Sequence, residues 1–283
     1  MKKHTLFVPA IFLMILISSC QKDKNAAAPA VSDVKTNSID FTSDALHHTY
    51  SPVSNGLVGY YPFCGNANDA TSYGNDGTLR DFDSENISYG LPILTVDKYG
   101  HPNSAYSFNG LSDYIELNNG NPLAYAGTIV FGTADVKEFS IYARFKTDTA
   151  GTIAFFGDQG YNVASLVFNA NRSVSFNWNF VTQTTTQLLS SSAVVSGGPV
   201  CLDPKKWVDV VLNFKNSCLI LYLNGILVGF EHTNFSTGTI FNNFLIGASY
   251  RTFPYSYFKG SIDEVRLYNK GLTKPEIDYL LTH

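Results

Sequence analysis

The chain has 283 residues, with 19 Lys and Arg against 23 Asp and Glu, which gives a formal net charge of −4. Hydrophobic residues make up 45% and charged residues 15%, so the chain is too apolar and too weakly charged to be disordered. The negative balance argues against a protein that binds the phosphate backbone of nucleic acids, because nothing supplies a basic face. The 17 Tyr, 21 Phe and 2 Trp favour β structure.

The first nineteen residues have the features of a secretory signal. Lys2 and Lys3 precede an apolar run at 7–17, which is too short for a bilayer span of about 20 residues. The run ends in Ile17-Ser18-Ser19-Cys20, which resembles a bacterial lipobox. We therefore expect a signal at 1–19 and acylation of Cys20, whose two or three acyl chains would anchor the protein to a membrane. A plain signal peptide with an incidental cysteine is the alternative.

Residues 20–55 are expected to form a flexible tether, since they contain Ala, Ser and Thr and few large apolar side chains. The residues after the cysteine, Gln21-Lys22-Asp23-Lys24, resemble the short tags that send some Gram-negative lipoproteins to the outer face, and they fit the start of a soluble linker equally well. The expected location is the outer membrane of a Gram-negative bacterium, with surface exposure as one possibility.

From residue 56 onward, apolar residues recur with a period of two. In 138–147, Phe139, Ile141, Ala143 and Phe145 share one face, which is typical of a half-buried strand. Asn224-Gly225 indicates a tight hairpin. The pattern predicts a large antiparallel sandwich. The expected strands are 57–63, 105–108, 114–117, 138–147, 152–156, 164–168, 173–180, 187–195, 207–214, 218–224, 226–231, 244–247 and 258–268.

One helix is expected at the C-terminal end. Thr273 and Glu276 have the spacing of a capping box, and Ile277, Leu280 and Leu281 form an apolar stripe at helical spacing. We expect this helix to close one edge of the sandwich.

Three cysteines remain after the signal, at Cys64, Cys201 and Cys218. An odd number leaves at least one free thiol or one intermolecular partner, and the sequence does not choose among the three pairings. The spacing fits no zinc site.

Several segments, taken in order, resemble the laminin-G-like jelly rolls of the concanavalin A-like lectin/glucanase superfamily. They are 57–63 (LVGYYPF), 65–79 (GNANDATSYGNDGTL), 105–110 (AYSFNG), 113–117 (DYIEL), 139–145 (FSIYARF), 207–211 (WVDVV), 221–225 (LYLNG), and 258–272 (FKGSIDEVRLYNKGL) with Glu276-Ile277. The resemblance covers 56–283 and implies an all-β fold, a two-sheet antiparallel jelly-roll sandwich, with frequent calcium and roles in binding glycans or proteins. Cys64, Cys218 and Asn224 depart from the pattern, and 118–137 and 181–206 look like insertions.

A structural calcium ion is expected at Asp69, Asn75 and Asp263. Strict alternation would place Asp263 on the apolar side of the last strand, where a carboxylate is costly unless it is paired or metal-bound. The 65–77 loop supplies oxygen donors of the kind that calcium prefers, and the family often places a cation between this loop and the last strand. The alternative is a loop of hydrogen-bonded Asx-turns.

Two loops carry candidate ligand-binding residues. Tyr250, Phe253 and Tyr255 lie in an aromatic-rich stretch that suits sugar stacking, although the same rings could instead fold onto the rim of the sandwich. Asp158 and Tyr161, in a loop that could lie near the concave face, are a second candidate.

The sequence gives little support to catalysis. No glutamate begins the E-x-D-x-x-E spacing of the related glucanases, and no Ser-His-Asp order, P-loop or HExxH motif is present. The sequence therefore predicts a lipid-anchored envelope protein whose domain binds extracellular carbohydrate without catalysis. An adhesion or scaffold lipoprotein that binds a protein partner is the alternative, and a divergent glycoside hydrolase is less favoured.

Overall fold

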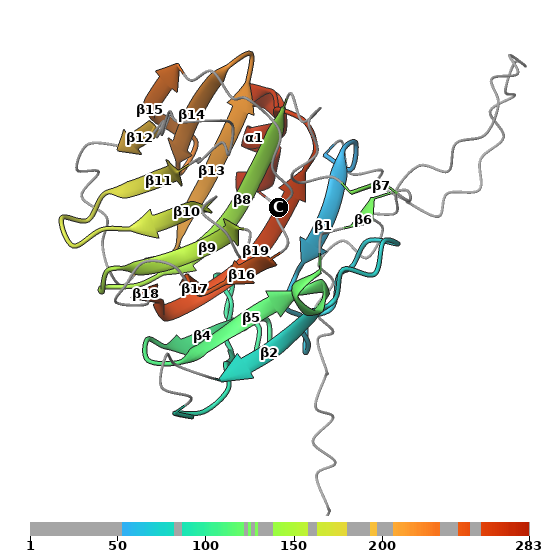
Figure 1. Ribbon diagram of the computed structural model, residues 1–283, viewed down its shortest axis with the longest axis vertical. Helices are drawn as coiled ribbons and strands as arrows, with labels where there is room; N and C mark the ends of the chain where they lie inside the picture. Colours follow the sequence, from blue (N-terminus) through green and yellow to red (C-terminus); the bar gives the residue numbers. More distant parts are fainter. Residues whose placement is uncertain are drawn as a thin grey trace, which may run out of the picture.

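The computed structural model describes residues 53–81, 87–121, 124–125, 128–129, 138–157, 163–179, 193–196, 206–232, 243–249 and 256–282. These residues form an antiparallel β-sandwich with one short helix near the C-terminal end (Figure 1). The expected fold class is thus confirmed. Cys20 and nearly all of the expected tether lie outside the described residues. Within the described part of the chain, no helix has the length and apolarity needed to cross a bilayer.

One layer, sheet A, has eight strands in the order β15-β14-β13-β8-β19-β4-β3, with β1 also paired to β19. The register places β4 beside the first half of β19 and β1 beside the second half. Its strands are β1 (Leu57–Tyr61), β3 (Ile93–Thr95), β4 (Ala105–Asn109), β8 (Phe139–Lys146), β13 (Val208–Lys215), β14 (Cys218–Leu223), β15 (Ile226–His232) and β19 (Lys259–Tyr268).

The other layer, sheet B, has seven strands in the order β12-β11-β10-β9-β16-β5-β2. They are β2 (Gly77–Asp81), β5 (Asp113–Leu117), β9 (Gly151–Gly157), β10 (Val163–Phe168), β11 (Val174–Asn179), β12 (Ala193–Ser196) and β16 (Asn243–Ile246). Two small ribbons accompany the sheets, one made of β6 (Ala124–Tyr125) and β7 (Thr128–Ile129), the other of β17 (Ala248–Ser249) and β18 (Ser256–Tyr257). A 3-10 turn, η1 (Asn118–Gly120), follows β5.

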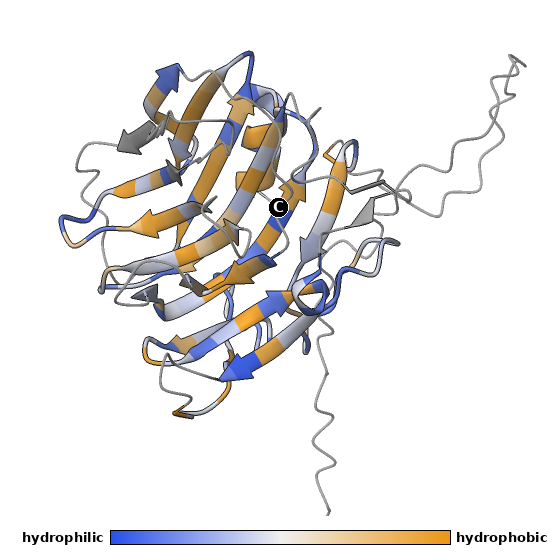
Figure 2. Cartoon of the chain, viewed as in Figure 1, coloured by the Kyte–Doolittle hydropathy of each residue, from blue (hydrophilic) through white to orange (hydrophobic). Residues whose placement is uncertain are grey.

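The main core lies between the two sheets, because alternate residues of facing strands point inward. Sheet A contributes Ile141, Phe145 and Leu212, and sheet B contributes Phe156 and Phe176. Figure 2 shows the corresponding alternation of apolar and polar positions along the strands.

The helix α1 (Lys274–Thr282) covers the outer face of sheet A, not an edge of the sandwich as expected. Its Ile277 and Leu280 pack with Tyr142 of β8 and Val211 of β13. The neighbours of those strand residues point into the main core, so Tyr142 and Val211 face outward. The capping pair is present, since the backbone N–H of Thr273 donates to Glu276 Oε2 at 2.7 Å.

Cys64 takes part in a disulfide bond, whereas Cys218 is a free thiol. This excludes the pairings that involve Cys218. Cys201 lies outside the described residues.

Candidate ligand-binding face and the predicted calcium site

Asp69 organises the loop between β1 and β2. Its Oδ1 accepts the backbone N–H groups of Tyr60 at 3.0 Å and Thr71 at 2.9 Å. Its Oδ2 accepts the Thr71 hydroxyl at 2.7 Å and the backbone N–H of Asn75 at 3.2 Å. An ionised carboxylate has about four lone-pair sites, so hydrogen bonds from this chain fill all of those on Asp69.

Asn75 fastens the same loop to the first strand. It is fully buried, and its Nδ2 donates to the carbonyl oxygen of Val58 at 3.1 Å. Its own carbonyl oxygen accepts the hydroxyl of Tyr61 at 2.7 Å. The structure therefore brings Asp69 and Asn75 together, as the sequence analysis expected, and uses both to hold β1.

Asp263 lies on the opposite face of β19 from the one that alternation predicts. Ile262 and Val265 both point into the main core, although their positions differ by three and strict alternation would put them on opposite faces. The cause is a β-bulge at Glu264, which has a positive φ of 52° and shifts the register between residues 263 and 266. Asp263 therefore shares the outer face of sheet A with Arg144, its partner residue on β8.

The three residues named for calcium do not fit that ion in this arrangement. The oxygens of Asp69 are already filled by hydrogen bonds, and Asp263 faces an arginine across the strand pair. In the described ranges, no group of three or more His, Cys, Asp or Glu side chains is placed to hold a metal ion. Calcium binding by the chain stays a prediction, and the described loop has the geometry of the Asx-turn alternative.

The outer face of sheet B is a candidate ligand-binding face. Residues that pair directly across antiparallel strands share a face, and one such row crosses six strands. Its neighbours, such as Ile115 and Phe156, point into the main core, so the row points outward. In spatial order the row is Thr78, Glu116, Leu245, Phe155, Ser165 and Asn177.

The middle of this face is apolar. Phe155 and Leu245 pack with Tyr114, and the β17–β18 ribbon adds Ala248 and Tyr257 to the same cluster. The ribbon thus lies on the outer face of sheet B.

One side of the face carries a polar cluster. Arg80 forms an ion pair with Glu116, with Nη2 at 2.7 Å and Nε at 2.9 Å from Oε2. Beside them, the Thr78 hydroxyl donates to Asn119 Oδ1 at 2.7 Å. Arg80 was not predicted as a site residue, because β2 was not expected from the sequence. The alternation of Tyr114 and Glu116 within β5 does indicate that Glu116 points outward.

The predicted ligand residues all fall outside the described residues. Tyr250, Phe253 and Tyr255 belong to the segment between β17 and β18, and Asp158 and Tyr161 to the segment between β9 and β10. The described residues that flank both segments belong to sheet B or to the ribbon packed on it. Both candidate segments therefore begin and end at the same layer of the sandwich.

A pair of carboxylates lies where β2 ends and β5 begins, since Asp81 and Asp113 are register partners there. Burial raises the pKa of Asp113 to about 6, against the effect of the Asn109 backbone N–H, and the charge of Asp81 adds to the rise. Burial would also raise the pKa of Asp81, but hydrogen bonds from Ser112 and Ser88 and from backbone N–H groups lower it to about 2. The two acids therefore titrate far apart.

A family model described as "Concanavalin A-like lectin/glucanases superfamily" matches residues 109–278, which is more than half of the chain. The chain belongs to this superfamily. The laminin-G-like resemblance is thereby confirmed. Among curated protein sequences, none matches this chain.

Solved structures with the same fold include several binding domains. Domain 4 of AbnA, a GH43 extracellular arabinanase from Geobacillus stearothermophilus solved with arabinotriose, is 20% identical, with a TM-score of 0.54, and the match covers 80% of this chain and 98% of that domain. A binding domain of botulinum neurotoxin DC in complex with SialylT is 13% identical, with a TM-score of 0.54 over 80% of this chain and 51% of that one. The same toxin domain in complex with rat synaptotagmin II has a TM-score of 0.55 and is 13% identical, and the match covers 80% of this chain and 51% of that one.

Proposed function

We propose that this protein is a lipid-anchored component of the cell envelope whose superfamily domain binds extracellular carbohydrate without catalysis. The observation that carries the proposal is the outer face of sheet B, where an apolar centre adjoins polar groups. The cluster of Phe155 and Tyr114 is itself buried, with side chains 2% and 5% exposed, and the half-buried ring of Tyr257 packs against it and supplies the accessible aromatic surface. Thr78, Glu116 and Asn177 supply half-buried hydrogen-bonding groups on the same face. Sugars have apolar ring faces and hydroxyl edges, so such a mixed surface suits them.

Structural neighbours support the choice of ligand class. The arabinanase domain was solved with arabinotriose, and a toxin binding domain was solved with SialylT. These ligands belong to those proteins. They show that this sandwich architecture accommodates oligosaccharides in other chains.

The placement of the acids supports a role without catalysis. Glycoside hydrolysis uses two carboxyl groups that flank the scissile bond. On the outer row of sheet B, Glu116 is engaged by Arg80. Asp81 and Asp113 are register partners, but both are buried: Asp113 is only 1% exposed, and both carboxylate oxygens of Asp81 already accept hydrogen bonds.

A glycan array tests the proposal, using the mature chain with a matched pair of variants. Asn177→Ala removes a hydrogen-bonding group from the face, and we expect about a tenfold loss of affinity for any glycan bound, as is typical for one hydrogen bond. Asn216→Gly, in the exposed turn between β13 and β14 where φ is 52°, is the control and should leave binding unchanged. Silence across plant, host and microbial glycans would reject the proposal, and release of reducing sugar would reject its non-catalytic part.

A protein partner is the second candidate. The structure of the toxin binding domain with rat synaptotagmin II shows that the same fold can also present a protein-binding surface. A pull-down partner whose binding is insensitive to Asn177→Ala, together with a silent glycan array, would favour this candidate.

A further inference from the structure

One end of the sandwich exposes a cluster of large apolar side chains. Residues 87–96 carry no charged side chain, and their exposed apolar residues are joined by one on the turn between β4 and β5. Each is between 40% and 70% exposed. This set, which we call the apolar ridge, consists of Ile87, Tyr89, Leu91, Ile93, Val96 and Leu111.

Asp81 fixes the backbone of the ridge through hydrogen bonds. Its Oδ1 accepts the backbone N–H of Tyr89 at 2.9 Å, and its Oδ2 accepts that of Gly90 at 2.8 Å and the Ser88 hydroxyl. Asn109 Nδ2 donates to the carbonyl oxygen of Gly90 at 3.1 Å, which ties the ridge to the β4–β5 turn. A surface that is ordered in advance loses little conformational entropy when it binds.

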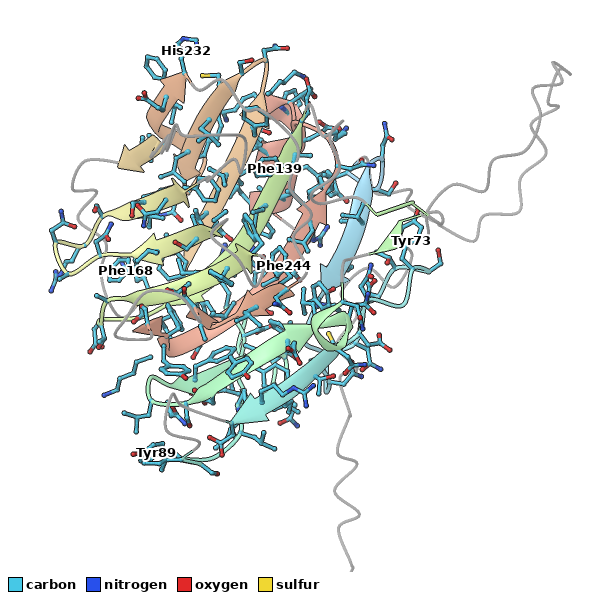
Figure 3. The ribbon with its side chains drawn as sticks, in the orientation of Figure 1. Tyr73, Tyr89, Phe139, Phe168, His232 and Phe244 are labelled. Carbon is cyan, nitrogen blue, oxygen red and sulfur yellow. The ribbon has the colours of Figure 1, made fainter. Side chains whose placement is uncertain are left out.

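The ridge occupies an extremity of the molecule. Figure 3 places Tyr89 at one end of the domain and His232 of β15 at the other. The charged groups at its base are turned inward, since Asp81 and Asp113 are 8% and 1% exposed. Lys259 is exposed beside the same turn. It lies so close to Gly110 that a Cβ atom added to this glycine would be 2.7 Å from the Cβ of Lys259. The described residues at this end of the domain thus present aliphatic side chains with the amine of Lys259 nearby.

We propose that the apolar ridge inserts into the interfacial region of a lipid bilayer. Its composition favours acyl chains, because five of its six members are Ile, Leu or Val, whereas sugars prefer aromatic platforms with polar edges. A protruding apolar end with a neighbouring cation is the arrangement that interfacial membrane binding uses.

An acylated Cys20 would hold the domain, and with it the ridge, near a bilayer. This step rests on the proposed lipidation of Cys20. Residues 21–52 would then separate the anchor from the first described residue. A flexible chain of that length has a root-mean-square span of about 30 Å. The tether would therefore keep the domain close to the membrane, where even a weak contact is populated.

Vesicle co-sedimentation tests the ridge separately from the anchor. The protein is the mature chain beginning at residue 20 with Cys20→Ser, so that neither the signal nor an acyl chain contributes; every described contact lies within 53–282. The probe is vesicles of phosphatidylethanolamine and phosphatidylglycerol. We expect binding that persists at high salt, because apolar insertion is not screened by ions.

A triple variant and a matched control locate the contact. Tyr89→Ser, Leu91→Ser and Ile93→Ser together should lower the partition coefficient at least tenfold, since each removes apolar surface from the lipid. Leu227→Ser with Phe230→Ser, on two equally exposed positions of β15, should change it less than twofold. Melting curves check that both variants remain folded.

Three results of the vesicle experiment would overturn the inference. The unacylated chain could fail to bind vesicles, the ridge variant could bind as well as the parent, or the β15 variant could show the larger loss. A ridge variant that instead loses glycan binding or self-association would also overturn it. A silent glycan array would reject the proposed carbohydrate ligand and leave the vesicle result unaffected, so the two failures are distinguishable.

Discussion

Arg266 and Tyr60 join the last strand of the sandwich to the first. The guanidinium carbon of Arg266 lies 4.1 Å from the centre of the Tyr60 ring, and Nη2 donates to the Tyr60 hydroxyl at 3.2 Å. Glu264 Oε2 accepts from Nε at 3.2 Å and from Nη2 at 3.1 Å. Burial alone would lower the pKa of Arg266, but Tyr60 and Glu264 raise it above its ordinary value, so the side chain stays charged.

Arg266→Met should lower the free energy of unfolding by about 3–5 kcal/mol, because it leaves the buried carboxylate of Glu264 without its cation. Chemical denaturation measures the loss. The double variant Arg266→Met, Glu264→Gln should recover part of it, since the uncompensated charge is then gone. A loss below about 1 kcal/mol for the single variant would contradict the buried ion pair.

Asp69→Asn should destabilise the protein by about 2–3 kcal/mol. The new amide group presents N–H donors to groups that are themselves donors, including the backbone N–H of Asn75 or Tyr60. Urea denaturation measures the effect. Asn66→Ala is the matched control, because Asn66 is exposed and its Oδ1 accepts only a local bond from the Asn68 N–H among the described contacts, so its loss should cost less than about 1 kcal/mol.

Calcium dependence has a separate test. Because the loop oxygens of Asp69 are filled by hydrogen bonds, we expect Asp69→Asn to lower Tm by the same amount in excess chelator and in calcium. The measurement is a set of melting curves. A fall in Tm on chelation that Asp69→Asn abolishes would restore the calcium site expected from the sequence.

Asp113 should make stability fall as the pH rises from about 4 to about 6. Its pKa is raised in the folded protein to about 6, so the folded state binds the proton more tightly than an unfolded chain with an ordinary pKa of about 3.9. The protonated form is thus the favoured one, and above pH 6 the buried carboxylate destabilises the fold by an amount on the order of 2–3 kcal/mol.

Asp113→Asn should remove that slope and raise stability at pH 7.5, since its amide oxygen can still accept the Asn109 N–H. Denaturation of both proteins between pH 4.5 and 7.5 gives the comparison, in a window where Asp81, with a pKa of about 2, remains ionised. Parallel pH profiles for the two proteins would contradict the assignment.

Alternation predicted the positions of the long strands and failed at one residue of β19. Strict period two places Asp263 with Val265, yet the bulge at Glu264 places Ile262 with Val265 instead. A bulge is set by how neighbouring strands pair, and a glutamate gives no local sign of a left-handed conformation. The expectation that Asp263 needed a metal ion depended on that alternation.

The sequence predicted the sandwich better than its edges. The edge strands β2 and β3 were missed, because Gly77–Asp81 reads as part of a polar loop and Ile93–Thr95 has only three residues. The position of the helix in the chain was predicted correctly. Its packing on the outer face of sheet A, where Leu280 joins Tyr142, was not, because it depends on how distant elements pack in three dimensions. The predicted ligand residues lie outside the described part of the chain, so their role stays a prediction.

The pairing of β1 with β19 has a consequence for biogenesis. Leu57 is the register partner of Tyr268, so β1 cannot pair with β19 until nearly the whole polypeptide has been synthesised. Such distant contacts make folding slow. If the signal expected at 1–19 directs export, this delay would keep the nascent chain unfolded until it reached the translocation channel.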